Sequence, residues 1–180
     1  MRRFIVLAEN TGYVPADGRK IIEKLRTQGH KVVDVRVATK HLEIDIQNDS
    51  PPTLHGFIVH EVVEVGEKTV LNPEEEFRRA VYLFNRERFW EAHETLEPLW
   101  RTSKGAEKQI LHALILTAAA YVHLQKNDRK GFHSIIKRAL KNLLTDHKVY
   151  RGIDLDDLRY KIKHAMESEN FFEIRVWNDD

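Results

Sequence analysis

The spacing of hydrophobic residues changes near residue 70 of this 180-residue chain. Before that point, hydrophobic and charged residues alternate over 33–37 and again over 42–46, and such alternation predicts strands with one buried face. Beyond it, hydrophobic residues recur every three or four positions, as over 77–84, and this period predicts amphipathic helices. The change of period therefore divides the chain into two parts.

The first part, residues 1–68, is predicted to form a small β-α-β-β-β unit. A helix that begins near Asp17 and ends at Gly29 separates the first two strands. Only four residues, 38–41, separate the second and third strands, which predicts a hairpin. The expected strands lie at 4–7, 33–37, 42–46 and 57–65.

The second part, residues 72–168, is predicted to form five antiparallel helices. Asn72 is a favourable N-cap and Pro73 suits the first helical turn. Short links between the helices favour antiparallel neighbours. The third helix is hydrophobic on nearly all sides, so we expect it to be central. The first expected helix begins at Pro73, and the last is capped by Asp154. The three helices between them are expected at 89–101, 109–125 and 131–144.

The tail, residues 170–180, alternates again, with Phe172, Ile174 and Val176 at every second position. Alternation predicts a strand, but an isolated strand is not stable and a helical domain offers it no partner. Two courses stay open: the tail rejoins the N-terminal sheet, or it lies extended along the helices. The overall fold class is α+β in either case.

The composition excludes several kinds of functional site. The chain has no cysteine, which excludes disulfides, thiolate zinc sites and a cysteine nucleophile. With 29 Lys and Arg against 28 Asp and Glu, the net charge of +1 does not favour a nucleic-acid-binding protein. The longest apolar stretch, 110–124, is shorter than the roughly 20 residues of a membrane span. We expect a cytoplasmic protein without a membrane partner.

The most informative stretch is 83–101, which runs from Leu-Phe-Asn to Leu-Trp-Arg. Together with a second stretch over 114–127, it resembles domain-of-unknown-function family 309, an uncharacterised bacterial and archaeal family. The family signature is a histidine, a glutamate four residues later, and a tryptophan or tyrosine three residues after that. Here these residues are His93, Glu97 and Trp100.

The resemblance covers roughly residues 72–147. It implies an all-α helical-hairpin domain from a prokaryotic family, and metal binding by the His/Glu motif has been suggested for that family without an established activity. The chain departs from the pattern at 112–116, which reads His-Ala-Leu-Ile-Leu where the family often has Gln-Gly-Leu-Ile-Gln. A site built on those amides is therefore altered.

The spacing alone also points to a site. His93 and Glu97 are four residues apart, so they share one face of a helix and can touch one divalent ion, zinc or manganese. Two ligands do not complete a zinc site. In a helical hairpin, His112 lies within about one turn of their height and is the expected third ligand. Glu94 is an adjacent carboxylate that can act as a base.

Other interpretations of the motif stay open. The pair His93 and Glu97 can be a structural hydrogen-bonded clip, or part of an organic-ligand pocket that includes Glu94, Trp100 and His123. Whether the protein is an enzyme is left open. The alternative function is a non-enzymatic interaction module or homo-oligomer that uses a helical surface. A basic segment from Lys126 to Arg151 provides possible contacts with nucleic-acid phosphates, although its simplest interpretation is a solvated helix face.

Overall fold

A computed structural model describes residues 1–66 and 72–177. The chain divides into two compact units, one of residues 1–69 with 124–127, the other of residues 70–123 and 128–180. We call them the sheet unit and the helical unit. The predicted change near residue 70 falls in the segment 67–71, outside the described residues, as do the last three residues of the predicted tail.

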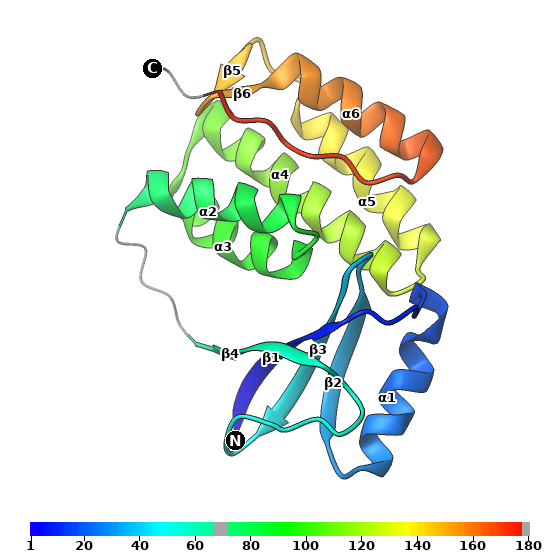
Figure 1. Ribbon diagram of the computed structural model, residues 1–180. Coiled ribbons are helices and arrows are strands. Elements are labelled where there is room, and N and C mark those ends of the chain that lie inside the picture. Colours follow the sequence, from blue (N-terminus) through cyan, green and yellow to red (C-terminus); the bar gives the residue numbers. More distant parts are fainter. Residues whose placement is uncertain (67–71, 178–180) are drawn as a thin grey trace. The chain divides into compact units, whose positions relative to one another are not determined.

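The sheet unit has the predicted β-α-β-β-β order. Its strands form an antiparallel sheet in the order β2-β3-β1-β4 (Figure 1). The predicted hairpin is present, because Val37 of β2 pairs with Leu42 of β3. The elements are β1 (Arg2–Glu9), a 3-10 turn (Pro15–Asp17), α1 (Gly18–Thr27), β2 (Lys31–Val37), β3 (His41–Asn48) and β4 (Val59–Val65).

Helix α1 covers one face of this sheet and closes a hydrophobic core. Ile21 and Leu25 of α1 are buried in one cluster with residues of β1, β2 and β3. In β2 the register shifts between Val32 and Asp34, so Val32 is buried while Val33 is 46% exposed. The uniform alternation expected over 33–37 is therefore interrupted by a β-bulge, which turns one side chain outward.

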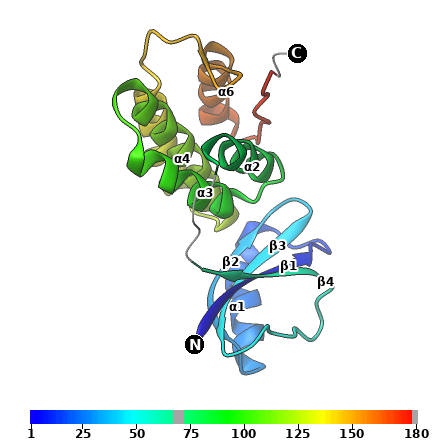
Figure 2. The ribbon, with the colours of Figure 1, turned by 90° about the vertical axis from the view of Figure 1, so that its left-hand side faces the viewer.

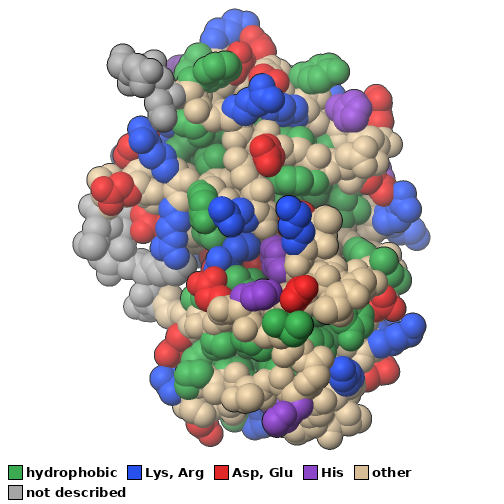
Figure 3. Space-filling model, in the orientation of Figure 1, with side chains coloured by type: hydrophobic (Ala, Val, Ile, Leu, Met, Phe, Trp, Pro, Cys, Tyr) green, Lys and Arg blue, Asp and Glu red, His purple; other side chains and the backbone are tan. Residues whose placement is uncertain are grey.

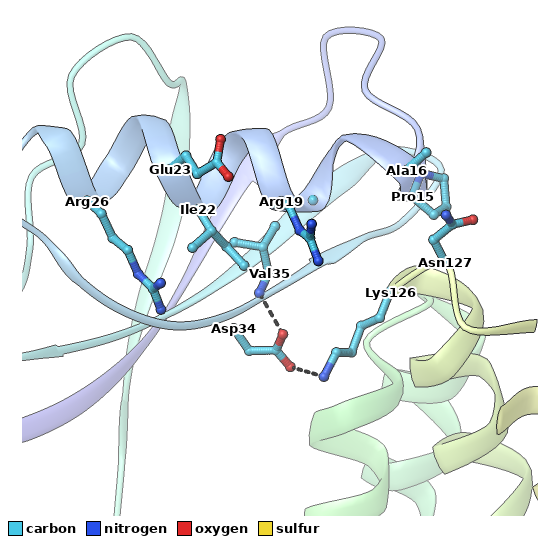
Figure 4. Close-up of a pocket in the computed structure, with 11 residues that line it drawn as sticks. Pro15, Ala16, Arg19, Ile22, Glu23, Arg26, Asp34, Val35, Lys126 and Asn127 are labelled. Carbon is cyan, nitrogen blue, oxygen red and sulfur yellow. Dashed lines mark hydrogen bonds and ion pairs between the residues drawn. The ribbon is translucent and has the colours of Figure 1, made fainter.

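The side of α1 that faces β2 also carries polar side chains. Figure 4 shows Arg19 and Arg26 projecting toward β2 with Ile22 between them. Arg26 Nη2 donates a hydrogen bond to the carbonyl of Val32 at 3.0 Å. This contact ties the end of α1 to the start of β2.

The helical unit contains the five predicted helices (Figure 2). Asn72 caps the first as expected, because its Oδ1 accepts from the amide of Glu74 at 3.0 Å. Asp154 caps the last by accepting from the amide of Asp156 at 2.8 Å. The helices are α2 (Pro73–Asn85), α3 (Phe89–Thr102), α4 (Gly105–Gln125), α5 (Arg129–Asn142) and α6 (Leu155–Ser168).

A short hairpin that the pattern did not predict precedes α6. Its strands are β5 (Val149–Tyr150) and β6 (Ile153–Asp154). Arg151 at its turn donates to Glu74 Oε2 at 3.0 Å and to Glu107 Oε1 at 3.2 Å. The hairpin is thereby fixed to α2 and α4. With the sheet unit, this architecture confirms the α+β fold class.

The tail takes the second of its two expected courses. The four strands of the large sheet come from residues 2–65, so among the described residues the tail does not rejoin that sheet. It leaves α6 at Glu169 and runs back in an extended form to the β5–β6 hairpin (Figure 1). Among the described residues, no helix is long and apolar enough to cross a membrane.

Candidate functional site

The motif residues His93 and Glu97 lie on α3, one turn apart. His93 Nε2 is 3.8 Å from Glu97 Oε1, and the two side chains are 25% and 30% exposed. Glu97 also accepts a hydrogen bond from Arg101 Nη2 at 2.6 Å, which continues the same face of the helix. The pair is thus a half-exposed polar contact supported by a third charged side chain.

Trp100 and His112 meet between α3 and α4. Their ring centroids are 5.4 Å apart at an interplanar angle of 31°. His112 Nδ1 lies 3.2 Å from Asn142 Oδ1 of α5, and Lys108 Nζ is 5.0 Å from the centroid of the Trp100 ring. These contacts join three helices through one histidine ring, with a cation–π interaction on the indole.

The expected three-ligand metal site is not assembled. His112 contacts Trp100 and Asn142, whereas His93 contacts Glu97 and lies 3.3 Å from Glu94 Oε1 through Nδ1. Among residues 1–66 and 72–177, no group of three or more His, Cys, Asp or Glu side chains is arranged to hold a metal ion. The helix rise placed His112 within about one turn of the height of His93 and Glu97, but helix spacing could not fix the direction of its ring.

His123, a further ligand-binding candidate, lies apart from that motif at the end of α4. Its Nδ1 is 2.6 Å from Asp128 Oδ2, and Asp128 also caps α5 by accepting from the amide of Gly131 at 2.9 Å. A Cβ at Gly131 would overlap both His123 Nδ1 and Asp128 Oδ2, so a larger residue there would displace these two side chains. Asn127 has a left-handed φ of 61° and ends the helix.

A second contact region, which the sequence did not single out, holds the tail. Phe171 and Phe172 pack against an aromatic cluster, with centroid distances to Phe84 of 5.8 Å in both cases. Tyr121 is part of this cluster, and its hydroxyl donates to the carbonyl of Asn170 at 2.7 Å. Burial raises the pKa of Tyr121, so it stays a neutral donor.

Asn85, the last residue of α2, binds the backbone of the tail. Its Nδ2 donates to the carbonyl of Ile174 at 2.8 Å, and its Oδ1 accepts from the amide of Ile174 at 2.8 Å. Ile174 is 5% exposed. One side-chain amide therefore satisfies both backbone groups of a buried residue in an extended segment, as a neighbouring strand would do.

Two more contacts hold the tail along its length. Lys161 Nζ of α6 donates to the carbonyl of Glu173 at 3.0 Å, and the amide of Trp177 donates to the carbonyl of Gly152 at 2.8 Å. Gly152 has a φ of +75°, and a Cβ there would collide with the carbonyl of Trp177. We call the contacting set the tail-binding surface: Phe84, Asn85, Phe89, Tyr121, Gly152 and Lys161.

Ion pairs of Glu169 stabilise the turn between α6 and the tail. Glu169 has a left-handed φ of 57° and accepts from Arg129 Nε at 3.1 Å, and its Oε1 lies 2.7 Å from His133 Nε2. Desolvation alone would raise the pKa of Glu169, but the hydrogen bonds from His133 and Arg129 outweigh it and lower this pKa. A non-glycine residue in this conformation is uncommon, and the ion pairs offset its strain.

Some basic side chains of the segment from Lys126 to Arg151 are paired with acidic residues, and others are exposed. Arg151 and Lys148 are neutralised, the latter by Asp156 at 3.0 Å. Lys130, Lys137, Arg138 and Lys141 of α5 are exposed. On the face of the molecule drawn in Figure 3, by contrast, basic, acidic and hydrophobic side chains are intermixed.

Comparison with known proteins bears on this helical unit. Residues 77–135 match the family model of a domain of unknown function (DUF309). The resemblance found in the sequence is thus confirmed over this part of the chain. The DUF309 segment runs from α2 into α5 and includes His93, Glu97, Trp100 and His112, as well as Asn85.

Two relatives are similar to about half of the chain. An uncharacterized protein of Aquifex aeolicus (strain VF5) is 28% identical over 90 residues, which are 49% of this chain and 27% of that protein. The alignment therefore spans about a quarter of that relative. The crystal structure of a conserved hypothetical protein from Thermus thermophilus is 27% identical, with a TM-score of 0.44, over 51% of this chain and 95% of that one. Function therefore has to be argued from the geometry.

Proposed function

We propose that the helical unit is a protein-interaction module that binds an extended polypeptide segment on the tail-binding surface. The observation that carries this proposal is the pair of hydrogen bonds between the Asn85 amide and the two backbone groups of Ile174. In the structure, the chain's own tail occupies this surface. The proposal is that the same surface accepts an equivalent segment from outside the chain.

The chemistry of the surface suits such a segment. Asn85, Tyr121 and Lys161 all bind backbone groups, and backbone groups are present in every peptide. The aromatic rings add selectivity, because they contact Phe171 and Phe172 of the tail. The preferred ligand is therefore a peptide with two aromatic residues followed, two positions later, by an aliphatic one.

The family motif fits this function as an internal support. His93 pairs with Glu97, while His112 links Trp100 of α3 to Asn142 of α5. Such satisfied polar contacts specify one packing of the helices. On this account Trp100 and His112 hold α3 to α4 and α5, and α3 supplies Phe89 to the tail-binding surface.

The test uses a full-length chain whose own tail is released. The variant F171A/F172A removes the tail's aromatic contacts and leaves the tail-binding surface intact. A labelled peptide of residues 169–177 is then titrated against it by fluorescence anisotropy. We expect the peptide to bind, and a further Asn85→Ala change to weaken binding about thirtyfold, since two hydrogen bonds contribute about 1 kcal/mol each.

Two controls keep the result specific. Tyr82→Ala changes an exposed residue of α2 that lies outside the tail-binding surface, so peptide affinity should not change. A peptide with Ile174→Asp should bind weakly, because Ile174 is buried when bound. Absence of peptide binding, or affinity that is the same with and without Asn85, would contradict the proposal.

A second candidate function rests on the distance of 3.8 Å between His93 Nε2 and Glu97 Oε1, two half-exposed groups that can bind one divalent cation. It is tested by elemental analysis of untagged protein purified without chelator, as wild type and His93→Ala. Near-stoichiometric metal that is lost in the variant supports a cation site. Metal absent from both, even after zinc or manganese is added, makes the pair a structural clip.

A further inference from the structure

Helix α5 has a charge composition unlike that of the chain as a whole. Its sequence, Arg-Lys-Gly-Phe-His-Ser-Ile-Ile-Lys-Arg-Ala-Leu-Lys-Asn, contains five basic and no acidic residues, whereas the whole chain carries a net charge of +1. Arg129 is paired with Glu169. We call the other four the α5 basic face: Lys130, Lys137, Arg138 and Lys141.

Three of these side chains are aligned along the helix, and all four are exposed. At 100° per residue, the three lysines lie within about 40° of one another, and they span about 16 Å of helix axis. All four side chains are exposed. Within the described residues, none of the four forms an ion pair, although basic side chains elsewhere in the unit, such as Arg151 and Arg159, do so.

Helix stability does not account for this arrangement. Lys130 lies in the first turn of α5, where the helix dipole disfavours a positive charge. Lys137 and Lys141 are four residues apart on the same face, so they repel each other. A face that is only solvated would be more stable with acidic residues in the first turn and opposite charges at this spacing. A bound polyanion would offset both the unfavourable dipole interaction of Lys130 and the repulsion between Lys137 and Lys141.

The surroundings of the face distinguish between polyanions. The apolar side of α5, with Phe132, Ile136 and Ala139, is buried within the unit and cannot insert into a lipid surface. The exposed side of α5 presents no Phe, Tyr or Trp ring among its described residues, and its one imidazole, His133, is paired with Glu169, so stacking of single-stranded bases has no platform. A straight row of charges without stacking groups matches the regular phosphates of a duplex.

We propose that the α5 basic face binds the phosphate backbone of double-stranded nucleic acid without reading its sequence. This interaction is separate from the tail-binding surface, because none of its four residues contacts the tail in the described part of the chain. Each cation would neutralise about one phosphate. The affinity is therefore governed by counterion release and depends steeply on salt.

The test measures binding of the full chain to a labelled 20-base-pair DNA duplex of mixed sequence, by fluorescence anisotropy, from low to physiological salt. Four phosphate contacts predict a slope of log K against log salt of about −3 to −4. In K137Q/K141Q the slope should become shallower by about 2. The matched control K104Q/K163Q removes the same charge from exposed lysines outside α5 and should keep the wild-type slope.

Several outcomes would overturn the proposal. One is the absence of duplex binding at low salt, and another is an equal loss of binding in the control variant, which would indicate net charge alone. Binding to anionic lipid vesicles but not to the duplex would assign the face to a membrane surface. Equal competition by polyglutamate at the same charge concentration would assign it to acidic proteins. Circular dichroism of both variants checks that the fold is intact.

Discussion

Replacing Asn85 with alanine tests how the tail is held. The change removes the donor to the Ile174 carbonyl and the acceptor for the Ile174 amide, both at 2.8 Å. Each hydrogen bond has a net value of about 1 kcal/mol, and leaving a buried partner unpaired raises the total to about 2–3 kcal/mol. Ile174 is only 5% exposed, so water cannot replace the lost amide while the tail stays bound.

The loss should be local, because the tail follows the last helix and Asn85 contacts it only at Ile174. We expect the tail to detach without unfolding the five helices. Amide hydrogen exchange at Trp177, whose amide bonds to the Gly152 carbonyl, reports on this opening from a distance. A cost of about 2–3 kcal/mol predicts exchange about 30- to 150-fold faster at Trp177.

Asn85→Asp provides a second variant, since it keeps an acceptor for the Ile174 amide but places a carboxylate oxygen against the Ile174 carbonyl. Its effect on exchange should therefore be at least as large as that of Asn85→Ala. Amides in the middle of α2 should exchange as in wild type. Unchanged exchange at Trp177 in Asn85→Ala would refute the reasoning, and so would an equal acceleration across all five helices.

Three further predictions concern stability. Gly131→Ala should lower the free energy of unfolding by about 1 kcal/mol in urea titrations, because the added Cβ displaces His123 and Asp128 and weakens the N-cap of α5. This loss is expected although alanine normally favours a helix. Asp154→Ala should cost about 1 kcal/mol for the same reason at α6, measured in the same way. The pKa of Glu169 is lowered in the folded state, so its contribution is present above its usual pKa of 4.5 and is lost as the pH falls below it. Glu169→Gln should therefore destabilise the protein at pH 7 but not at strongly acidic pH.

Most of the helical unit follows from its sequence because local signals agree with the hydrophobic period. Asn72 and Asp154 cap where expected, and all five helices form. The start of α4 at Gly105 lies four residues before the expected one, because the first turn contains few hydrophobic residues. The bulge in β2 at Val32 could not be predicted, since periodicity does not reveal an inserted residue.

The tail shows what a hydrophobic pattern leaves undetermined. Its alternation predicted an extended chain, but alternation does not say which groups satisfy the backbone. A sheet edge was one solution, and the amide of Asn85 is the other. Asn85 gave a signal only as part of the Phe-Asn pair that begins the resemblance to the family.

The positions of the candidate site residues along their helices were predictable, but the directions of their side chains were not. His93 and Glu97 share a face, as their four-residue separation requires. His112 lies on the next helix of the hairpin, as expected, but Asn142 of α5 and the indole ring of Trp100 determine the direction of its ring. The partner from α5 depends on tertiary packing, which spacing along the chain does not contain.

The measurement that tests the central claim most directly compares two full-length chains for affinity toward the labelled peptide of residues 169–177. In wild type the tail competes from within the same molecule at an effective concentration in the millimolar range. The tail-released variant F171A/F172A should therefore bind the peptide at least tenfold more tightly. Equal affinity for both chains, or affinity for neither, would contradict the account that this surface binds extended segments.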